Sequence, residues 1–187
     1  MEMEKIVSFL EEAEGLKSVL RTAYASSGRR ESTAEHSWRL ALLAGVMLED
    51  SSGLDIPKTL MMCLIHDIGE IYEGDVSAAL HPDKEGKLAT ETRAAQKVFS
   101  HLSKDRANWL MDIFLEYNGG VTPEAKLVKA LDKAETILQH CQGRNPAGFD
   151  YLFNLEYGKE YFTQDEDLKK LRTLLDGKTM EKANADK

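Results

Sequence analysis

The sequence lacks the features that mark several large classes of protein. It has two cysteines, Cys63 and Cys141, in 187 residues. A disulfide framework needs more, so we expect two reduced thiols in a cytoplasmic protein. No apolar run approaches the roughly 18 residues of a membrane span, and the acidic, periodic N-terminus does not resemble a signal peptide. We therefore expect no membrane partner.

Positive charge is also in the minority. The formal net charge is −8, from 24 Lys and Arg against 32 Asp and Glu. Nucleic acids and anionic membranes bind basic surface, so this balance argues against both as partners. It leaves open a small anionic substrate, which arginines and a metal ion can hold locally.

Proline is scarce, and alternating strand patterns longer than four residues are absent. Apolar residues instead recur with helical spacing. Ser32 and Glu35 have the form of a capping box, and residues 21–31 are interpreted as a loop. The sequence predicts an all-α fold of about seven to nine helices in one bundle-like domain, with helices over 3–20, 32–48, 55–72, 84–102, 104–118, 123–142, 147–162 and 165–176.

Within this single domain, 1–187, we expect a core over about 16–142, C-terminal helices over 147–176 and a frayed polar tail over 177–187. The segment LMMCLIHDIGEIY is apolar nearly all round, which is typical of a buried central helix. Trp38 and Trp109 are expected in the core.

His66 and Asp67 lie inside this apolar helix. A buried carboxylate is unfavourable unless something pairs with it. A cation can satisfy Asp67, and neutral imidazole is a common ligand of divalent transition metals. Glu70 follows one turn later on the same face, where a carboxylate can handle the proton of a water or leaving group. Taken alone, each of these residues also fits an ordinary hydrogen-bonded core residue or a solvated surface acid.

Two further residues complete a pattern. His36 stands early in its helix, and Asp132 lies at the edge of a buried stripe, where Lys129 and Lys133 are not expected to share its face. A His, a His-Asp pair about thirty residues later and an Asp about sixty-five residues beyond is the ligand order of the HD superfamily. Two imidazoles and two carboxylates suit a first-row divalent ion and leave positions open for water and a phosphate oxygen.

Three strings carry a closer resemblance: AEHSWRLALLAG, LIHDIGEIYEGDVSAAL and EAKLVKALDKAETILQ. They resemble the HD-domain 5′-deoxynucleotidases and their eukaryotic HD-domain-containing relatives, with consistent spacing from about Leu16 to Gln142. The resemblance implies a hydrolase that removes phosphate from deoxyribonucleoside 5′-monophosphates. It also implies one divalent ion (cobalt, manganese or a similar ion such as zinc, iron, nickel or magnesium) and a homodimer.

The resemblance also assigns roles to single positions. The metal ligands of the family match His36, His66, Asp67 and Asp132. The catalytic acid matches Glu70, the residue that orients the nucleotide matches Asp75, and the phosphate-binding arginine matches Arg21 by spacing.

One position departs from the bacterial pattern. Bacterial members place a tryptophan directly after the phosphate-binding arginine, where it contributes to rejecting ribose. Here that position is Thr22, with Tyr24 two residues on, an arrangement more like the eukaryotic and archaeal branch. Selection between deoxyribose and ribose is therefore left open, as is the base.

Other interpretations remain at this point. HD-fold di-iron oxygenases recruit two extra histidines, and His81 and His101 lie in the required interval, although both have the sequence context of surface residues. A hydrolase of another phosphate ester keeps the same ligands. A non-catalytic nucleotide-binding module is less consistent with a complete set of ligands and a catalytic acid. Arg29 and Arg30 are interpreted as surface charge.

Overall fold

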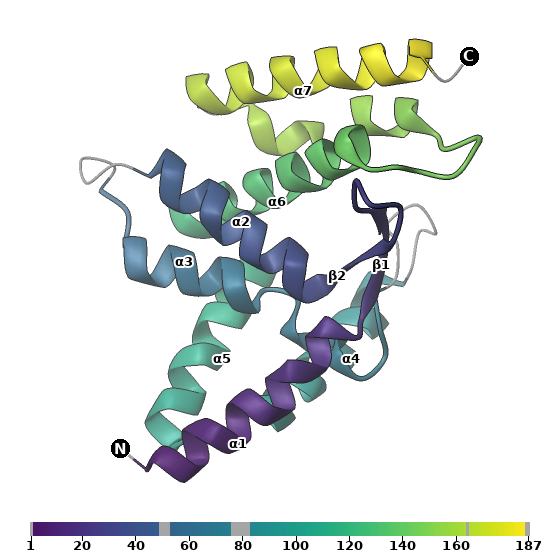
Figure 1. Ribbon diagram of the computed structural model, residues 1–187. Coiled ribbons are helices and arrows are strands. Elements are labelled where there is room, and N and C mark those ends of the chain that lie inside the picture. Colours follow the sequence, from purple (N-terminus) through teal and green to yellow (C-terminus); the bar gives the residue numbers. More distant parts are fainter. Residues whose placement is uncertain (1, 49–52, 76–82, 164, 186–187) are drawn as a thin grey trace.

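The computed structural model describes residues 2–48, 53–75, 83–163 and 165–185. Within these ranges the chain is mainly α-helical, which confirms the expected fold class (Figure 1). The α-helices are α1 (Met3–Ala13), α2 (Thr33–Met47), α3 (Ile56–Ile65), α4 (Lys84–Phe99), α5 (Lys104–Gly119), α6 (Pro123–Gln142) and α7 (Glu166–Ala185). The short elements are η1 (Glu14–Lys17), η3 (Ile68–Ile71), η5 (Tyr151–Leu155), η6 (Lys159–Phe162) and the strands β1 (Leu20–Tyr24) and β2 (Arg30–Ser32). None of the helices in these ranges is long and apolar enough to cross a membrane.

Helix α6 is the central element of the core. It contacts α2, α3, α5 and α7, and Val128 and Leu131 on it are fully buried. Leu40 of α2, Met62 of α3 and Phe114 of α5 are buried around it. Each such side chain contributes about 2 kcal/mol on leaving water. The charged residues that α6 also buries therefore sit on a rigid, well-packed support.

Local signals in the sequence place the starts of the helices that carry the site. The capping box at α2 is present: Ser32 Oγ accepts from the backbone N of Glu35, and the Glu35 carboxylate accepts from Ser32 N at 2.9 Å. Thr122 caps α6 in the same way, with its hydroxyl accepting from Ala125 N at 3.2 Å. Such a cap contributes about 1 kcal/mol, and it fixes the first turn of α2, where His36 lies.

Residues 21–31 were expected to form a loop, but they contribute most of an antiparallel hairpin of β1 and β2. The hairpin has no alternating apolar face that a sequence pattern could reveal. It rests instead on the end of α6, where Gln139 Nε2 donates to the carbonyl of Tyr24 at 2.6 Å. The approach is so close that a Cβ on Gly143 would lie 2.1 Å from that carbonyl oxygen. Arg21 on β1 is thereby tied to the helix that carries Asp132.

The predicted helix over 55–72 is interrupted at His66 and Asp67. Helix α3 ends at Ile65, and the chain turns through His66 and Asp67 into η3. The turn brings Gly69 against α4, where an added Cβ would lie 2.5 Å from Glu91 Cβ. The chain can follow this path only because residue 69 has no side chain.

Two tryptophans expected in the core lie at the surface. Trp38 is 61% exposed and Trp109 is 38% exposed. Helix α2 buries Leu40 and Ala44 instead, and its opposite side carries the exposed Trp38, Leu42 and Val46. Because α2 is apolar on several sides, the sequence could not show which side faces the core.

The C-terminal region also differs from the expected helices. Residues 147–162, predicted as one helix, form the two short turns η5 and η6. Helix α7 continues to Ala185, through most of the tail over 177–187 that was expected to fray. The reason is visible at Thr179, which is fully buried and bonds Cys141 and Asn154.

Candidate metal centre

The two histidines of the predicted ligand set converge beside α6. His36 comes from the first turns of α2, and His66 stands at the C-terminal end of α3. Both are buried, and their ring centroids lie 5.3 Å apart. The Nε2 atoms of both rings face the same two carboxylates.

Those carboxylates are Asp67, directly before η3, and Asp132 on α6. Asp67 Oδ2 lies 3.0 Å from His66 Nε2 and 3.9 Å from His36 Nε2. Asp132 Oδ1 lies 3.1 Å from His36 Nε2 and 4.0 Å from His66 Nε2. The structure thus brings the four predicted ligands together, with one donor atom of each pointing inward.

The chemistry of this donor set fits a divalent cation. Burial opposes ionisation of Asp67, yet the charge of the adjacent His66 holds its pKa below the usual range. Burial opposes ionisation of Asp132 as well, and the charge of Lys133 and the hydrogen bond from His36 hold its pKa well below normal. His66 Nε2 is buried and has no hydrogen-bond partner among the described residues. Two ionised carboxylates and an unpartnered imidazole nitrogen are the donors that a first-row divalent ion binds.

Contacts behind the ligands fix their orientation. His66 Nδ1 lies 2.9 Å from the carbonyl of Cys63, which holds the proton on Nδ1 and leaves the Nε2 lone pair facing the cluster. Asp132 Oδ2 accepts from Tyr117 Oη at 2.9 Å and from Lys133 Nζ at 2.7 Å. The expectation that Lys133 would not share the face of Asp132 was wrong, because its long flexible side chain curls back to its neighbour.

His36 has a carboxylate behind it that the sequence did not single out. Its Nδ1 makes a hydrogen bond to Glu135 Oε2, and Arg39 Nε donates to the other oxygen of Glu135 at 2.6 Å. Glu135 follows Asp132 by three residues and so shares its face of α6. This spacing could have indicated that Glu135 lies beside the site, but a glutamate in a helix is more often solvated.

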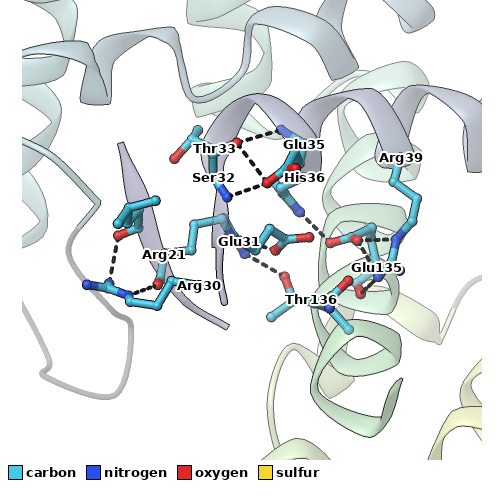
Figure 2. Close-up of polar contacts among 12 residues, drawn as sticks. Arg21, Arg30, Glu31, Ser32, Thr33, Glu35, His36, Arg39, Glu135 and Thr136 are labelled. Carbon is cyan, nitrogen blue, oxygen red and sulfur yellow. Dashed lines mark hydrogen bonds and ion pairs between the residues drawn. The ribbon is translucent and has the colours of Figure 1, made fainter. Parts of the chain in front are cut away.

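Arg21 reaches the edge of the cluster from β1 (Figure 2). Its Nη1 lies 3.5 Å from Asp67 Oδ2, its Nη2 donates to Thr136 Oγ1 at 3.0 Å, and its Nε lies 3.4 Å from Glu31 Oε2. Burial alone would lower the pKa of Arg21, but the surrounding acids, Asp67 first, outweigh burial and raise the pKa above its ordinary value. A permanently charged guanidinium therefore borders the ligand set.

Glu70 is buried in η3 with only long contacts. Thr33 Oγ1 donates to one oxygen at 3.3 Å, and Lys87 Nζ of α4 lies 3.5 Å from the other. Burial, and then the negative charges of Asp67 and Asp75, raise the pKa of Glu70 to about 9. Asp75 is itself only partly buried. Lys87 was not identified from the sequence because nothing in its helix marks it out.

The remaining candidates lie elsewhere. His101 lies near Glu12 of α1, with its Nε2 3.9 Å from that carboxylate, and does not join the ligand set. His81 lies outside the described residues. Arg29 is exposed and pairs with Glu35, while Arg30 donates to the carbonyl of Arg21 at 2.6 Å. Both arginines are thus exposed, as expected.

Comparisons with known proteins place the chain among HD domains. Residues 13–172 match the family model described as "HD domain". The human "5′-deoxynucleotidase HDDC2" is 34% identical over 136 residues, which are 72% of this chain and 66% of that protein. The Schizosaccharomyces pombe "5′-deoxynucleotidase hdd1" is 33% identical over 164 residues, 84% of this chain and 79% of that protein. A crystal structure titled "Predicted metal-dependent phosphohydrolase", from Magnetospirillum magnetotacticum MS-1, superposes with a TM-score of 0.78 at 28% identity, covering 97% of this chain and 95% of the other.

Proposed function

The chain belongs to the HD domain family, and from this premise we propose that it is a divalent-metal-dependent phosphohydrolase that removes phosphate from nucleoside or deoxynucleoside 5′-monophosphates. The observation that carries the proposal is the convergence of two imidazoles and two carboxylates around the unpartnered Nε2 of His66. The names of the human and yeast relatives support the substrate class. We extend the proposal to one HD domain spanning residues 1–187.

In this proposal His36, His66, Asp67 and Asp132 hold the ion. A bound divalent ion supplies positive charge to phosphate oxygens and lowers the pKa of a water. Cobalt and manganese are the ions we propose first, because a site of two imidazoles and two carboxylates accepts either.

The chain's own groups then divide the remaining work. Arg21 holds a phosphate oxygen through Nη1, the donor that borders the proposed ligand Asp67, while Nε and Nη2 face Glu31 and Thr136. Glu70 orients the attacking water or carries its proton, since it is a buried carboxyl one turn after Asp67 and its ion pair with Lys87, at 3.5 Å, is long. Asp75 accepts hydrogen bonds from the sugar. Thr22 and Tyr24 leave both sugars as candidates.

Two finer points belong to the same proposal. We propose a cytoplasmic protein, supported by two cysteines that are both free and buried. We also propose a homodimer, supported by the stripe of exposed apolar side chains at Trp38, Leu42 and Val46 on α2. Sedimentation of the wild-type chain beside Trp38→Glu tests the second point: a dimer that becomes a monomer supports it.

The direct test is a screen of ribo- and deoxyribonucleoside monophosphates against a panel of divalent ions, with released phosphate as the readout. Wild type should release phosphate only when an ion is added. His66→Ala should lose ion binding, measured by calorimetry, and at least about 1000-fold in kcat/KM, equivalent to about 4 kcal/mol. Full metal content and full activity in His66→Ala would contradict the proposal. If the protein hydrolyses another phosphate ester but no nucleoside monophosphate, the substrate class is wrong and the proposed metal-dependent hydrolysis still stands.

A further inference from the structure

Two buried acids lie behind the proposed metal ligands and have no role so far in binding the ion or the substrate. Glu31 on β2 is 4% exposed, and Glu135 on α6 is 1% exposed. Figure 2 shows them between Arg21 on one side and Arg39 on the other. Burying two carboxylates is unfavourable unless each has a defined partner, so their placement calls for a physical reason.

A second metal ion is not that reason. The ligand atoms of Glu31, His36 and Glu135 do lie close enough to hold one. However, Arg39 Nε already lies 2.6 Å from Glu135 Oε1, and Arg21 Nε lies 3.4 Å from Glu31 Oε2. The two guanidinium groups occupy the positions of positive charge, and a further cation there would be repelled by both.

We propose that these acids are two positioning residues with separate tasks: Glu135 orients His36 toward the metal ion, and Glu31 orients Arg21 toward the substrate phosphate. The inference rests on the proposed function, because it assigns His36 to the ion and Arg21 to phosphate. Neither acid touches the reacting atoms.

The contact of Glu135 acts on the ligand His36. A carboxylate that accepts from Nδ1 keeps the proton on that nitrogen when an ion replaces the proton of Nε2, so that the Nε2 lone pair can bind the ion. It also increases the basicity of the ring. Arg39 holds the other oxygen of Glu135, and its Nη1 donates to Gln142 Oε1 at 3.1 Å. The carboxylate is thus fixed at both oxygens, and it holds the ring of His36 in turn.

The contact of Glu31 acts on the arginine. Arg21 Nε faces Glu31, and Nη2 donates to Thr136 Oγ1 at 3.0 Å. These contacts involve Nε and Nη2, so that Nη1 is left facing Asp67. Nη2 is fixed by a hydrogen bond, whereas Nε and Glu31 Oε2 make no hydrogen bond among the described residues and attract each other as an ion pair. A guanidinium oriented in this way loses less conformational freedom when an anion binds at Nη1. Glu31 should therefore act on phosphate affinity and leave the ion unaffected.

The test separates the two tasks with Glu135→Gln and Glu31→Gln. Calorimetry with Mn²⁺ alone measures ion affinity, and inhibition by inorganic phosphate at saturating Mn²⁺ measures anion affinity. Glu135→Gln should weaken Mn²⁺ binding by about 10- to 100-fold, the usual effect of losing a partner behind a ligand, with phosphate inhibition within about twofold of wild type. Glu31→Gln should weaken phosphate inhibition by about 10-fold and leave Mn²⁺ affinity within about twofold.

A matched control and a second variant keep the result interpretable. Glu124→Gln removes another buried carboxylate from α6, one that pairs with Lys58 far from the centre, and should change neither constant. If Glu135→Gln fails to fold, Arg39→Ala removes the support of Glu135 from a partly exposed position and should weaken Mn²⁺ binding in the same direction by a smaller factor.

Equal losses of both affinities in Glu31→Gln and Glu135→Gln would overturn the division of tasks, as would wild-type Mn²⁺ affinity in Glu135→Gln or wild-type phosphate inhibition in Glu31→Gln. These results differ from failure of the proposed function. A wild-type chain that binds no divalent ion would remove the proposed function and this inference together.

Discussion

Two buried polar clusters adjoin helix α6, and they are built in opposite ways. The metal-centre cluster lies around Asp132, at the middle of the helix. The C-terminal cluster lies at the end of the helix and consists of His140, Asn154, Arg172 and Thr179. Both clusters are mostly buried, with Asp67 partly exposed in the first, so burial and polarity alone do not distinguish them.

The distinction lies in the partners. In the C-terminal cluster Arg172 donates to the carbonyls of residues 154, 155 and 157 and pairs with Asp176 at 2.8 Å. His140 Nδ1 lies 2.8 Å from Asn154 Oδ1, and Asn154 Nδ2 donates to Thr179 Oγ1. In the metal-centre cluster His66 Nε2 has no hydrogen-bond partner within the described chain, and the carboxylates of Asp67 and Asp132 face the same two imidazoles. A cluster completed by its own chain stabilises the fold, whereas a cluster with converging unpartnered donors is arranged for something else.

The sharpest way to test this contrast is Glu70→Gln in the metal-centre cluster. We expect kcat/KM to fall by about 10²- to 10⁴-fold, the usual contribution of a proton-transfer group. The melting temperature of the metal-free protein should be equal or higher at pH 7. The raised pKa of Glu70 means that the folded protein loses stability as pH rises from its ordinary value toward about 9, and the neutral amide removes that loss. Near-normal turnover would remove Glu70 from the mechanism.

Arg172→Leu tests the other side of the contrast. It leaves buried carbonyls without donors, so the free energy of unfolding in urea should fall by about 3 kcal/mol. Activity per folded molecule should be retained, because the hydrogen-bond partners of Arg172 in the described chain lie at residues 154, 155, 157 and 176, outside the metal-centre cluster. Lys170→Leu, on the exposed side of α7, is the control and should change stability by less than about 0.5 kcal/mol. A large loss of turnover in folded Arg172→Leu would show that the two clusters are coupled.

A smaller effect is expected from His140. Burial lowers its pKa, so the folded chain binds fewer protons there than the unfolded chain does. Stability from this group is therefore present above the unfolded pKa and is lost as pH falls below about 6.5. His140→Gln should flatten that part of the pH dependence of urea unfolding and lower stability at pH 7.5 by about 1 kcal/mol through the lost bond to Asn154. An unchanged pH profile in the variant would contradict this origin.

The sequence predicted which four residues converge, because their order and spacing can be read along the chain. Their role as metal ligands stays a prediction. The order and spacing of His36, His66, Asp67 and Asp132 survive in any fold that brings the helices together, and the resemblance supplied that fold. The all-α class and the HD family are confirmed. The roles of Glu70, Asp75 and Arg21 stay predictions, although the structure places Arg21 and Glu70 beside the ligands.

The missed features depend on packing. Glu31 and Glu135 are common residues whose burial follows only from how β2 meets α6. The hairpin was missed because its partner at the end of α6 is distant in sequence, and the exposure of Trp38 was missed because α2 is apolar on several sides. Lys133 was misjudged because helix geometry places its Cα, whereas a long side chain can return to its neighbour.

Gly69, which lies between Asp67 and Glu70 in the sequence, is required for steric reasons. A single methyl group at that position would act as a wedge between η3 and α4, because no room exists for it beside Glu91. The wedge would push Lys87 away from Glu70 and tilt the peptide that follows Asp67. An alanine there would therefore resemble a catalytic defect in any assay, although the atom gained has no chemistry of its own. The motif from His66 to Glu70 therefore contains a residue selected by the space available to it as well as residues with reactive groups.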